Sequence, residues 1–312
     1  MGILLAIQGA VSQGVLWGIM ALGVYMTYRV LDIADLTVDG SFALGGSICA
    51  TMITIGVNPW LSLIVAIAAG AAAGAVTGFL HTKCDIPAIL AGILTQIGLY
   101  SVNLRIMGRS NTPLLKLDTM FKQLVALTGL PAAWVSLIIG TVFCSALIAL
   151  LYCFFGTEIG SAIRATGSNE HMVRSLGVNT NFTKVLGLMV GNALIALSGA
   201  LVTQSQGYAD IKMGTGAIVI GLASIIIGEV LFSGKKRMAF GTKLFSVILG
   251  SVIYRIIVAL VLQMGLNTDD LKLLTAILVA VALAVPVAID KRRQVQSYKA
   301  SLGKEDDGHA GN

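Results

Sequence analysis

Charged side chains are scarce in this sequence. Asp, Glu, Lys and Arg together make up 12% of the 312 residues, whereas hydrophobic residues make up 56% and the mean hydropathy is +0.88. Soluble domains carry about 25% charged residues, so this chain has too few polar groups to cover the surface of a water-soluble fold. The composition excludes a soluble globular domain and predicts an all-α, polytopic membrane helical bundle.

Residues that hold metals or perform catalysis are few as well. The three histidines, at positions 81, 171 and 309, lie far apart, and the four cysteines show no metal-ligand spacing. We therefore expect no metal site. The sequence contains no HExxH motif, no GxSxG motif and no paired carboxylates in a catalytic context, so we expect no catalytic residues and disfavour a membrane enzyme.

A nucleotide site is also lacking. The closest approach to a phosphate-binding loop is "GEVLFSGKK", residues 228–236, where five residues separate the glycines instead of four and Lys236 replaces the magnesium-binding Ser or Thr. The formal net charge is +6, but no basic stripe with interleaved aromatic residues exists, so nucleic acid is not an expected partner. In a membrane protein such an excess of Lys and Arg is typical of cytoplasmic loops.

What the sequence has in abundance is long apolar runs. Because about 20 apolar residues cross a bilayer as a helix, we predict a transmembrane domain at residues 1–290 with about nine spans, in the range eight to ten. The segments lie at roughly 3–28, 40–56, 59–81, 86–105, 133–155, 183–205, 214–232, 240–264 and 271–289. The first has no basic start, so no cleavable signal peptide is expected. The tail at 291–312 is polar and is predicted to be a disordered cytoplasmic segment.

The distribution of Lys and Arg predicts the orientation. Basic clusters at 235–237 and 291–293 are separated by two spans, so they lie on one side, which the positive-inside rule makes cytoplasmic. Counting spans places 156–182 and the carboxyl terminus on that side, and the amino terminus and 106–132 outside. Three basic residues in 106–132 go against the rule; they are Arg109, Lys116 and Lys122.

Two segments of the chain have similar sequences, and we call them the echoing segments. Residues 34–48 read "ADLTVDGSFALGGSI" and residues 209–225 read "ADIKMGTGAIVIGLASI". The predicted orientation places them on opposite sides, as in an inverted internal repeat, and glycine-interrupted segments of such repeats mark the transport path in many transporters. The alternative is that glycine-rich segments resemble one another by chance.

The stretch 156–182 is polar in an otherwise apolar chain. Asn169 can cap a helix over "EHMVRSL", Gly177 fits the position just past its end, and Glu170 and Arg174 complement the helix dipole. A connection between packed helices needs about 2–8 residues, so this one is expected to be an ordered helical hairpin. Two interpretations remain open, an amphipathic element lying on lipid headgroups and a docking surface for a soluble partner.

Residues 156–201 resemble the coupling-loop region of the permease subunits of ABC importers, especially the branched-chain amino acid and ribose-type permeases. "IADLTVDGSFALGGSI" resembles the segment after the first span of the same permeases, and the likeness covers roughly 15–290. Within that group the sequence is most similar to small single-permease systems paired with a lipoprotein-type binding protein, some of them linked to aromatic amino acids. The matching features are Gly156, Arg164-Ala165-x-Gly167, Asn169-Glu170, Leu176-Gly177-Val178-Asn179 and Ser198-Gly199-Ala200-Leu201.

The resemblance implies a homodimer of this chain in a prokaryotic cell membrane, surrounded by lipid. Two cytoplasmic ATPase subunits would bind ATP and magnesium, so no cofactor is expected in this chain. An external binding protein would deliver a small solute such as an amino acid, an aromatic one included, and 106–132 would contact it by position. The residues that would couple to the ATPase are Glu158, Ile159, Arg164, Gly167, Asn169, Glu170, Met172, Arg174, Leu176 and Gly177.

Polar side chains within the apolar segments are candidates for the translocation pathway, because ionisable groups are costly inside a membrane. The candidates are Asp39, Gln96, Asn192, Gln204, Asp210 and Arg255. Arg255 could bind a substrate carboxylate, or it could pair with a carboxylate or with carbonyl groups within the bundle. The amide side chains could equally form hydrogen bonds that hold helices together. An alternative function is an ion-gradient-driven secondary transporter. We disfavour it because no carboxylate is expected at mid-membrane.

Overall fold

The computed structural model describes residues 2–232 and 239–263 and, between 273 and 284, residues 273, 275–277, 279–281 and 284. The basic loop at 235–237 and the tail at 291–312 lie outside the described residues, and the expected last span at 271–289 lies largely outside them. The described elements, in chain order, are α1 (Gly2–Tyr25), the π-helix η1 (Met26–Val30), α2 (Val38–Thr54), α3 (Pro59–Lys83), α4 (Ala88–Met107), β1 (Asn111–Pro113), α5 (Met120–Thr128), α6 (Ala132–Gly156), α7 (Glu158–Ser168), α8 (Glu170–Ser175), α9 (Thr180–Gln206), β2 (Tyr208–Asp210), α10 (Ala217–Leu231) and α11 (Phe240–Gln263).

Six of the described helices are long and apolar enough to cross a membrane. They are Ala6–Val30, which combines α1 and η1, and α3, α4, α6, α9 and α11. The expected spans at 40–56 and 214–232 correspond to α2, which has 17 residues, and α10, which has 15, and neither is among these six helices. We call α2 and α10 the half-length helices, and the structure does not confirm nine spans.

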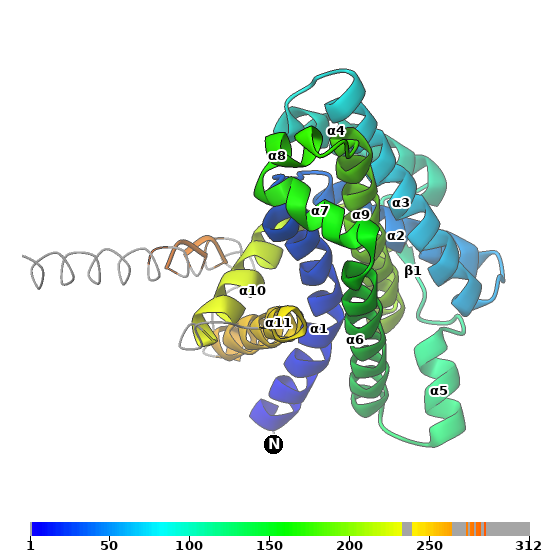
Figure 1. The fold of residues 1–312 in the computed structure, drawn as a ribbon. Helices are drawn as coiled ribbons and strands as arrows, with labels where there is room; N and C mark the ends of the chain where they lie inside the picture. The colour runs from blue at the N-terminus through cyan, green and yellow to red at the C-terminus, as the bar shows by residue number, and fades with distance from the viewer. Residues whose placement is uncertain are drawn as a thin grey trace, which may run out of the picture.

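The bundle has two distinct ends (Figure 1). The short helices α7 and α8 lie at one end, which we call the hairpin end. The amino terminus and α5 lie at the other, which we call the α5 end. Near the latter, β1 and β2 pair antiparallel, with Thr112 opposite Ala209.

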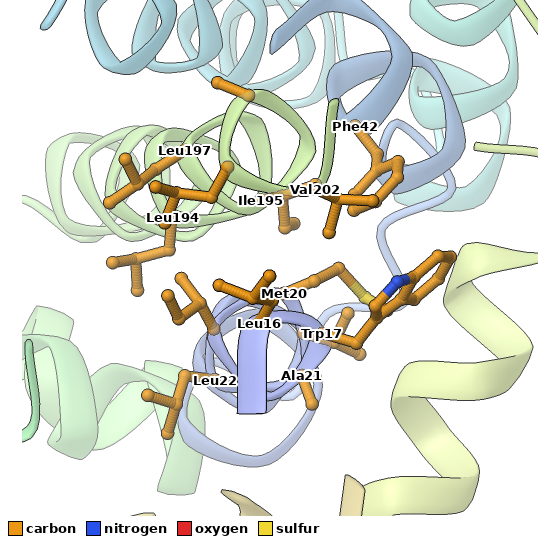
Figure 2. Close-up of a cluster of buried hydrophobic side chains, with 14 of the residues drawn as sticks. Leu16, Trp17, Met20, Ala21, Leu22, Phe42, Leu194, Ile195, Leu197 and Val202 are labelled. Atoms are coloured by element: carbon orange, nitrogen blue, oxygen red, sulfur yellow. The ribbon is translucent and has the colours of Figure 1, made fainter. Parts of the chain in front are cut away.

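Helix α9 is the centre of the bundle, with α1, α2 and α3 packed around it. Leu16 and Met20 of α1 face Ile195 of α9 in the buried core, where Trp17 also meets Phe42 of α2 (Figure 2). Polar bonds supplement this packing, because Ser198 donates a hydrogen bond across it to the carbonyl oxygen of Leu16 at 2.8 Å. Between helices in lipid, contacts of this kind replace the hydrophobic effect as the source of association.

Glycines let α3 approach α9 closely. Gly70, Gly74 and Gly78 follow one another at four-residue spacing on α3 and all face α9. A Cβ atom on Gly74 would lie 2.3 Å from the carbonyl oxygen of Leu188, and one on Gly70 would lie 2.4 Å from that of Asn192. This spacing is the small-residue pattern that brings transmembrane helices into backbone contact.

Helices α2 and α10 run in opposite directions. Ser41 bonds to Asn192 and Cys49 to Gln204, so α2 runs parallel to α9. Gly221 meets Val24 and Glu229 meets Arg29, so α10 runs parallel to α1, and α1 is antiparallel to α9 through Gly23–Gly191 and Leu16–Ser198. The two echoing segments are therefore inverted, as the sequence predicts.

The echoing segments also share a local structure. The carboxylate of Asp35 accepts a hydrogen bond from the backbone N–H of Thr37 at 2.9 Å, and that of Asp210 accepts one from Lys212 at 2.7 Å. Each aspartate thus closes the same turn two residues on, shortly before its half-length helix begins. This likeness is an observation that chance similarity of glycine-rich sequence does not explain.

We predict opposite effects of Ala at two helical glycines. Gly74→Ala should lower the stability of the solubilised protein by about 3 kcal/mol, because the new methyl group has no room against the α9 backbone. Gly98→Ala on α4 is the control, since nothing lies within 4 Å of that position, and Ala is the better helix former by about 1 kcal/mol. The measurement is the thermal unfolding temperature in detergent. Equal shifts for the two variants would contradict the proposed close packing.

Candidate functional site

The stretch 157–177 forms two short helices with a side-chain cap at each start. The Thr157 hydroxyl accepts a hydrogen bond from the N–H of Gly160 at 3.2 Å, and the Asn169 side chain accepts one from Met172 at 3.0 Å. Gly177 has φ +83°, the left-handed conformation that glycine adopts without strain. The expected helical hairpin, with Asn169 as cap and Gly177 at its end, is present. We call it the α7–α8 hairpin.

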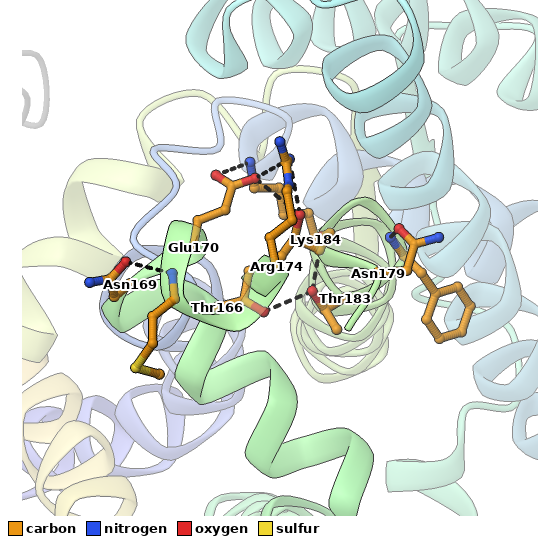
Figure 3. Close-up of polar contacts among 10 residues, drawn as sticks. Thr166, Asn169, Glu170, Arg174, Asn179, Thr183 and Lys184 are labelled. Carbon is orange, nitrogen blue, oxygen red and sulfur yellow. Dashed lines mark hydrogen bonds and ion pairs between the residues drawn. The ribbon is translucent and has the colours of Figure 1, made fainter. Parts of the chain in front are cut away.

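Glu170 joins the α7–α8 hairpin to the start of α9 (Figure 3). Its carboxylate accepts hydrogen bonds from Arg174 at 3.0 Å, Lys184 at 2.7 Å and Thr180 at 3.2 Å. The bond from Lys184 is the main reason that the pKa of Glu170 is lowered. Glu170 and Arg174 are thus bound within the chain, where they hold the hairpin at a fixed angle to α9.

Three large apolar side chains are exposed on the outer surface of the hairpin. The exposed fractions are 49% for Ile159, 47% for Met172 and 73% for Leu176. The other side is buried, with Ile163 at 0% and Val173 at 2%. The predicted coupling residues therefore include three large apolar side chains on the open surface. Glu158, Asn169 and Gly177 are also exposed there.

Arg164 and Gly167 contact the spans. A Cβ atom on Gly167 would lie 2.0 Å from the carbonyl oxygen of Val30, so α7 touches the backbone of η1 directly. The guanidinium of Arg164, although exposed, lies over the rings of Phe155 and Phe240, at 6.0 and 5.4 Å from their centroids. These two residues connect the hairpin to η1, α6 and α11.

An ion pair links the adjoining ends of α1 and α10. Arg29 of η1 donates two hydrogen bonds to the carboxylate of Glu229, one from Nε at 2.9 Å and one from Nη2. Bidentate pairs of this kind hold both side chains in a defined geometry. Glu229 stands near the basic loop in the sequence, but its partner in the fold is 200 residues away.

The half-length helices α2 and α10 meet at their amino-terminal ends. The carboxylate of Asp39, in the first turn of α2, accepts hydrogen bonds from the backbone N–H groups of Gly216 at 2.8 Å and Ile218 at 3.1 Å. Asp39 therefore caps α10, where the helix dipole favours a negative charge. Gly214 allows this contact, since a Cβ there would lie 2.0 Å from the carbonyl oxygen of Asp39.

A second carboxylate lies beside this junction. Asn192, in the middle of the 27-residue helix α9, donates a hydrogen bond to Asp35 at 2.7 Å and accepts one from Ser41 at 2.7 Å. The expectation that no carboxylate lies at mid-membrane is therefore wrong. It failed because the chain turns back after η1 and returns to the middle of the bundle before α2 begins.

A cavity of about 410 Å³ opens at the junction. The predicted residues Asp39 and Gln96 both line it, together with Tyr100, Ser101, Asn103 and Thr215. Of these, Tyr100, Ser101 and Thr215 were not predicted. A signal for Tyr100 exists in the sequence, because Gln96, Tyr100 and Asn103 repeat at the spacing of one helix face in α4.

The other predicted pathway residues lie elsewhere. Gln204 accepts a hydrogen bond from the N–H of Met120 and donates one to the carbonyl of Pro59, so it binds connecting segments together. Asp210 lies in β2 and bonds to Asn111 across the ribbon. Asn192 is buried at 0% exposure, and Arg255 stacks on Trp17 in α1. The six candidates are thus not one site.

Comparison with known proteins shows the family. Residues 6–286 match the family model for the permease component of the branched-chain amino acid transport system. The chain belongs to this permease family. The permease is 42% identical over 278 residues to the tyrosine transport system permease protein of Clostridioides difficile R20291, covering 89% of this chain and 90% of the relative.

Two other relatives and one solved structure are similar to most of this chain. An uncharacterized protein of Rickettsia prowazekii is 34% identical and covers 88% of this chain and 95% of its own length. The ribose import permease of Escherichia coli K12 is 29% identical, covering 88% and 82%. Among solved structures, PsaBC from Streptococcus pneumoniae in complex with Fab is similar in fold, with a TM-score of 0.50 at 17% identity, covering 88% of this chain and 90% of that one.

The function of the chain follows at the level of the family. It is a multi-pass membrane protein and the permease subunit of an ABC importer, which works with an ATPase and a binding protein. Both resemblances drawn from the sequence, to the branched-chain and to the ribose-type permeases, are confirmed. The family match, rather than the position of the carboxylates, replaces the secondary-transporter alternative.

The lowered pKa of Glu170 predicts a pH dependence. Its ion pairs should stabilise the protein above the ordinary Glu pKa of about 4.3, and this contribution is lost as pH falls through the lower folded-state pKa. Glu170→Gln should therefore reduce the unfolding temperature at pH 7, by no more than the equivalent of about 1 kcal/mol, and the difference from wild type should shrink towards pH 3. Glu158→Gln is the control, because Glu158 is exposed and makes no ion pair with any described residue. A difference independent of pH would contradict the assignment.

Proposed function

We propose that this permease imports an aromatic amino acid and that its ATPase binds to the α7–α8 hairpin. The substrate class is supported by the 42% identity to a tyrosine transport permease along nearly the whole chain. The coupling role is supported by one structural observation, the unbroken series of contacts from the hairpin to the junction of α2 and α10.

This series has three steps. Gly167 of α7 rests on the backbone of η1 at Val30. Arg29, also in η1, is bound through two hydrogen bonds to Glu229 at the end of α10. Helix α10 then leads to its amino terminus, where Asp39 caps it beside the cavity.

A displacement of the hairpin would therefore reach the middle of the bundle through packed backbone and one bidentate ion pair. The π-helix geometry of η1 fits this role, because such turns often occur at functional sites in helices. Glu170 adds rigidity, since its bonds to Arg174 and Lys184 make the hairpin and α9 move together.

The exposed apolar side chains suit a protein groove better than a lipid surface. Ile159, Met172 and Leu176 stand among the charged or polar residues Glu158, Asn169 and Arg174 at the end of the bundle. Apolar anchors surrounded by polar residues are typical of the centre of a protein interface. Of the two interpretations left open by the sequence, the structure favours docking of a soluble partner.

The complete importer would contain two copies of this chain, two ATPase subunits and an external binding protein. The hairpin end and the carboxyl terminus would be cytoplasmic in a prokaryotic cell, and the α5 end would face the binding protein. ATP and magnesium would be bound by the ATPase alone, so this chain would have no catalytic residues and no cofactor. Lipid would surround the apolar side chains of α3, α4 and α6 that are exposed in the single chain.

Loss of an apolar anchor should release the ATPase. Leu176→Glu places a charge at the most exposed large apolar residue of the hairpin, with 73% exposure, and should reduce co-purification of the ATPase roughly tenfold. Leu127→Glu is the matched control, because Leu127 is 81% exposed on α5 at the opposite end. The measurement is the ATPase-to-permease ratio after affinity purification from membranes. Equal retention of the ATPase in both variants would refute the docking role of the hairpin.

The substrate and the energy source can be tested together. Proteoliposomes containing the permease, its ATPase and its binding protein should accumulate L-tyrosine only when ATP is supplied to the ATPase side. An imposed proton or sodium gradient without ATP should have no effect. Accumulation driven by a gradient alone would contradict the proposed mechanism. ATP-driven uptake of a different solute would keep the mechanism but replace the substrate.

A further inference from the structure

Arg255 is a cation of the membrane domain, and no described residue places an anion beside it. It lies in α11, and its guanidinium stacks on the indole of Trp17, 4.0 Å from the ring centroid. Trp17 lies at the middle of the span Ala6–Val30. Among the described residues no carboxylate pairs with Arg255, and its Nε is buried without a hydrogen-bond acceptor.

Two buried polar atoms of α1, the helix on which Arg255 stacks, are unpaired as well. The indole N–H of Trp17 and the side-chain oxygen of Gln13 are both buried and have no hydrogen-bond partner among the described residues. Gln13 lies one helical turn before Trp17 on the same face of α1. Buried polar groups are normally paired, so three unpaired atoms on neighbouring side chains indicate a missing partner.

The acidic residues of the described membrane helices are already bound to other groups. Helices α1 to α4, α6 and α9 to α11 contain only two, Asp39 and Glu229. Asp39 is bound to the amino terminus of α10 and Glu229 to Arg29. Asp35, in the connection before α2, is bound to Asn192. A contact with an aromatic face attracts a guanidinium but does not supply the oxygen acceptors that its N–H groups require.

A buried aromatic pair adjoins this cation. The ring of Trp17 is 4.8 Å from that of Phe42 between centroids, with the planes inclined by 37°. Phe42 lies one turn after Asp39 in α2, so the aromatic pair extends from Arg255 towards the junction of α2 and α10. Figure 2 shows Trp17 and Phe42 side by side in the space between α1 and α2.

We propose that Arg255, Trp17 and Gln13 form a transient binding site for the zwitterionic head of the transported amino acid. The Arg255 guanidinium and the Trp17 N–H would donate hydrogen bonds to the α-carboxylate, and the Gln13 oxygen would accept one from the α-ammonium. This inference rests on the proposed function, because it takes an amino acid as the substrate.

Trp17 provides a direct probe of the site. The chain has three tryptophans, at positions 17, 60 and 134. In the assembled permease–ATPase complex carrying Trp60→Phe and Trp134→Phe, the permease indole signal comes from Trp17 alone, and the signal of the ATPase is subtracted using a Trp17→Phe complex. L-Tyrosine should change this emission in the absence of the binding protein, whereas L-tyrosinamide, which lacks the carboxylate, should not.

Variants of Arg255 separate a binding role from a structural one. Arg255→Gln should abolish the response of Trp17 and reduce ATP-driven uptake of tyrosine at least roughly tenfold, while the complex still assembles and hydrolyses ATP. Arg255→Lys should retain part of both, because the charge is kept and the two-pronged geometry is lost. Arg105→Gln, at the exposed end of α4, is the control and should behave as wild type.

The outcomes distinguish an error in the proposed substrate from an error in the proposed carboxylate site. If the wild-type complex with its binding protein imports no aromatic amino acid, the proposed substrate is wrong. If it imports tyrosine but Arg255→Gln imports it equally well, or if tyrosine and tyrosinamide act alike on Trp17, the carboxylate site is refuted. If Arg255→Gln prevents assembly, the site is tested by two other results. These are the uptake by the Arg255→Lys complex and the comparison of tyrosine with tyrosinamide in the complex that keeps Arg255.

Discussion

Backbone contact around α9 is the constraint on which the rest of the structure depends. Gly23 of α1, Gly45 of α2 and Gly74 of α3 each face α9 where an added Cβ would lie 2.6, 1.9 and 2.3 Å from a carbonyl oxygen. In lipid, exclusion of water does not drive helices together, so close packing and interhelical hydrogen bonds must. Three neighbours of α9 therefore approach it at a distance that only glycine permits.

This close packing makes the polar centre possible. Asn192 can reach both Asp35 and Ser41 because α2 lies directly on α9 at Gly45. The bonds hold the return loop in the middle of the bundle, where its backbone is enclosed by protein, as irregular backbone at membrane depth must be. Asp39 is thereby carried to the amino terminus of α10, and one carboxylate joins the two half-length helices.

The same arrangement connects the end of the bundle with its centre. Helix α10 has Asp39 bound at its amino-terminal end and Glu229 near its other end, so a movement at Glu229 would be transmitted to Asp39 along a single helix. The hairpin contacts η1, and η1 holds Glu229 through Arg29. Coupling in this permease would therefore be carried by rigid elements in contact, which shift together and so connect distant sites.

Much of this could be predicted from the sequence, because it depends on local patterns. Apolar length and scarce charge indicate a membrane helical bundle. Asn169 and Gly177 mark the ends of a helix by their own hydrogen bonding and backbone freedom. The two "AD" segments suggest an inverted pair but leave chance similarity open. The length of a half-helix could not be read in this way, since 40–56 and 214–232 are as apolar as complete spans. Likewise, the pairing of Arg29 with Glu229, 200 residues apart, and the stacking of Arg255 on Trp17 leave no mark in the order of residues. The sequence by itself determined the class of fold, the hairpin and the family, because composition and short-range geometry are sufficient for these. Only the tertiary structure decided which polar groups meet at mid-membrane, because the return loop after η1 is held in place by contacts with α9 that are distant in the chain.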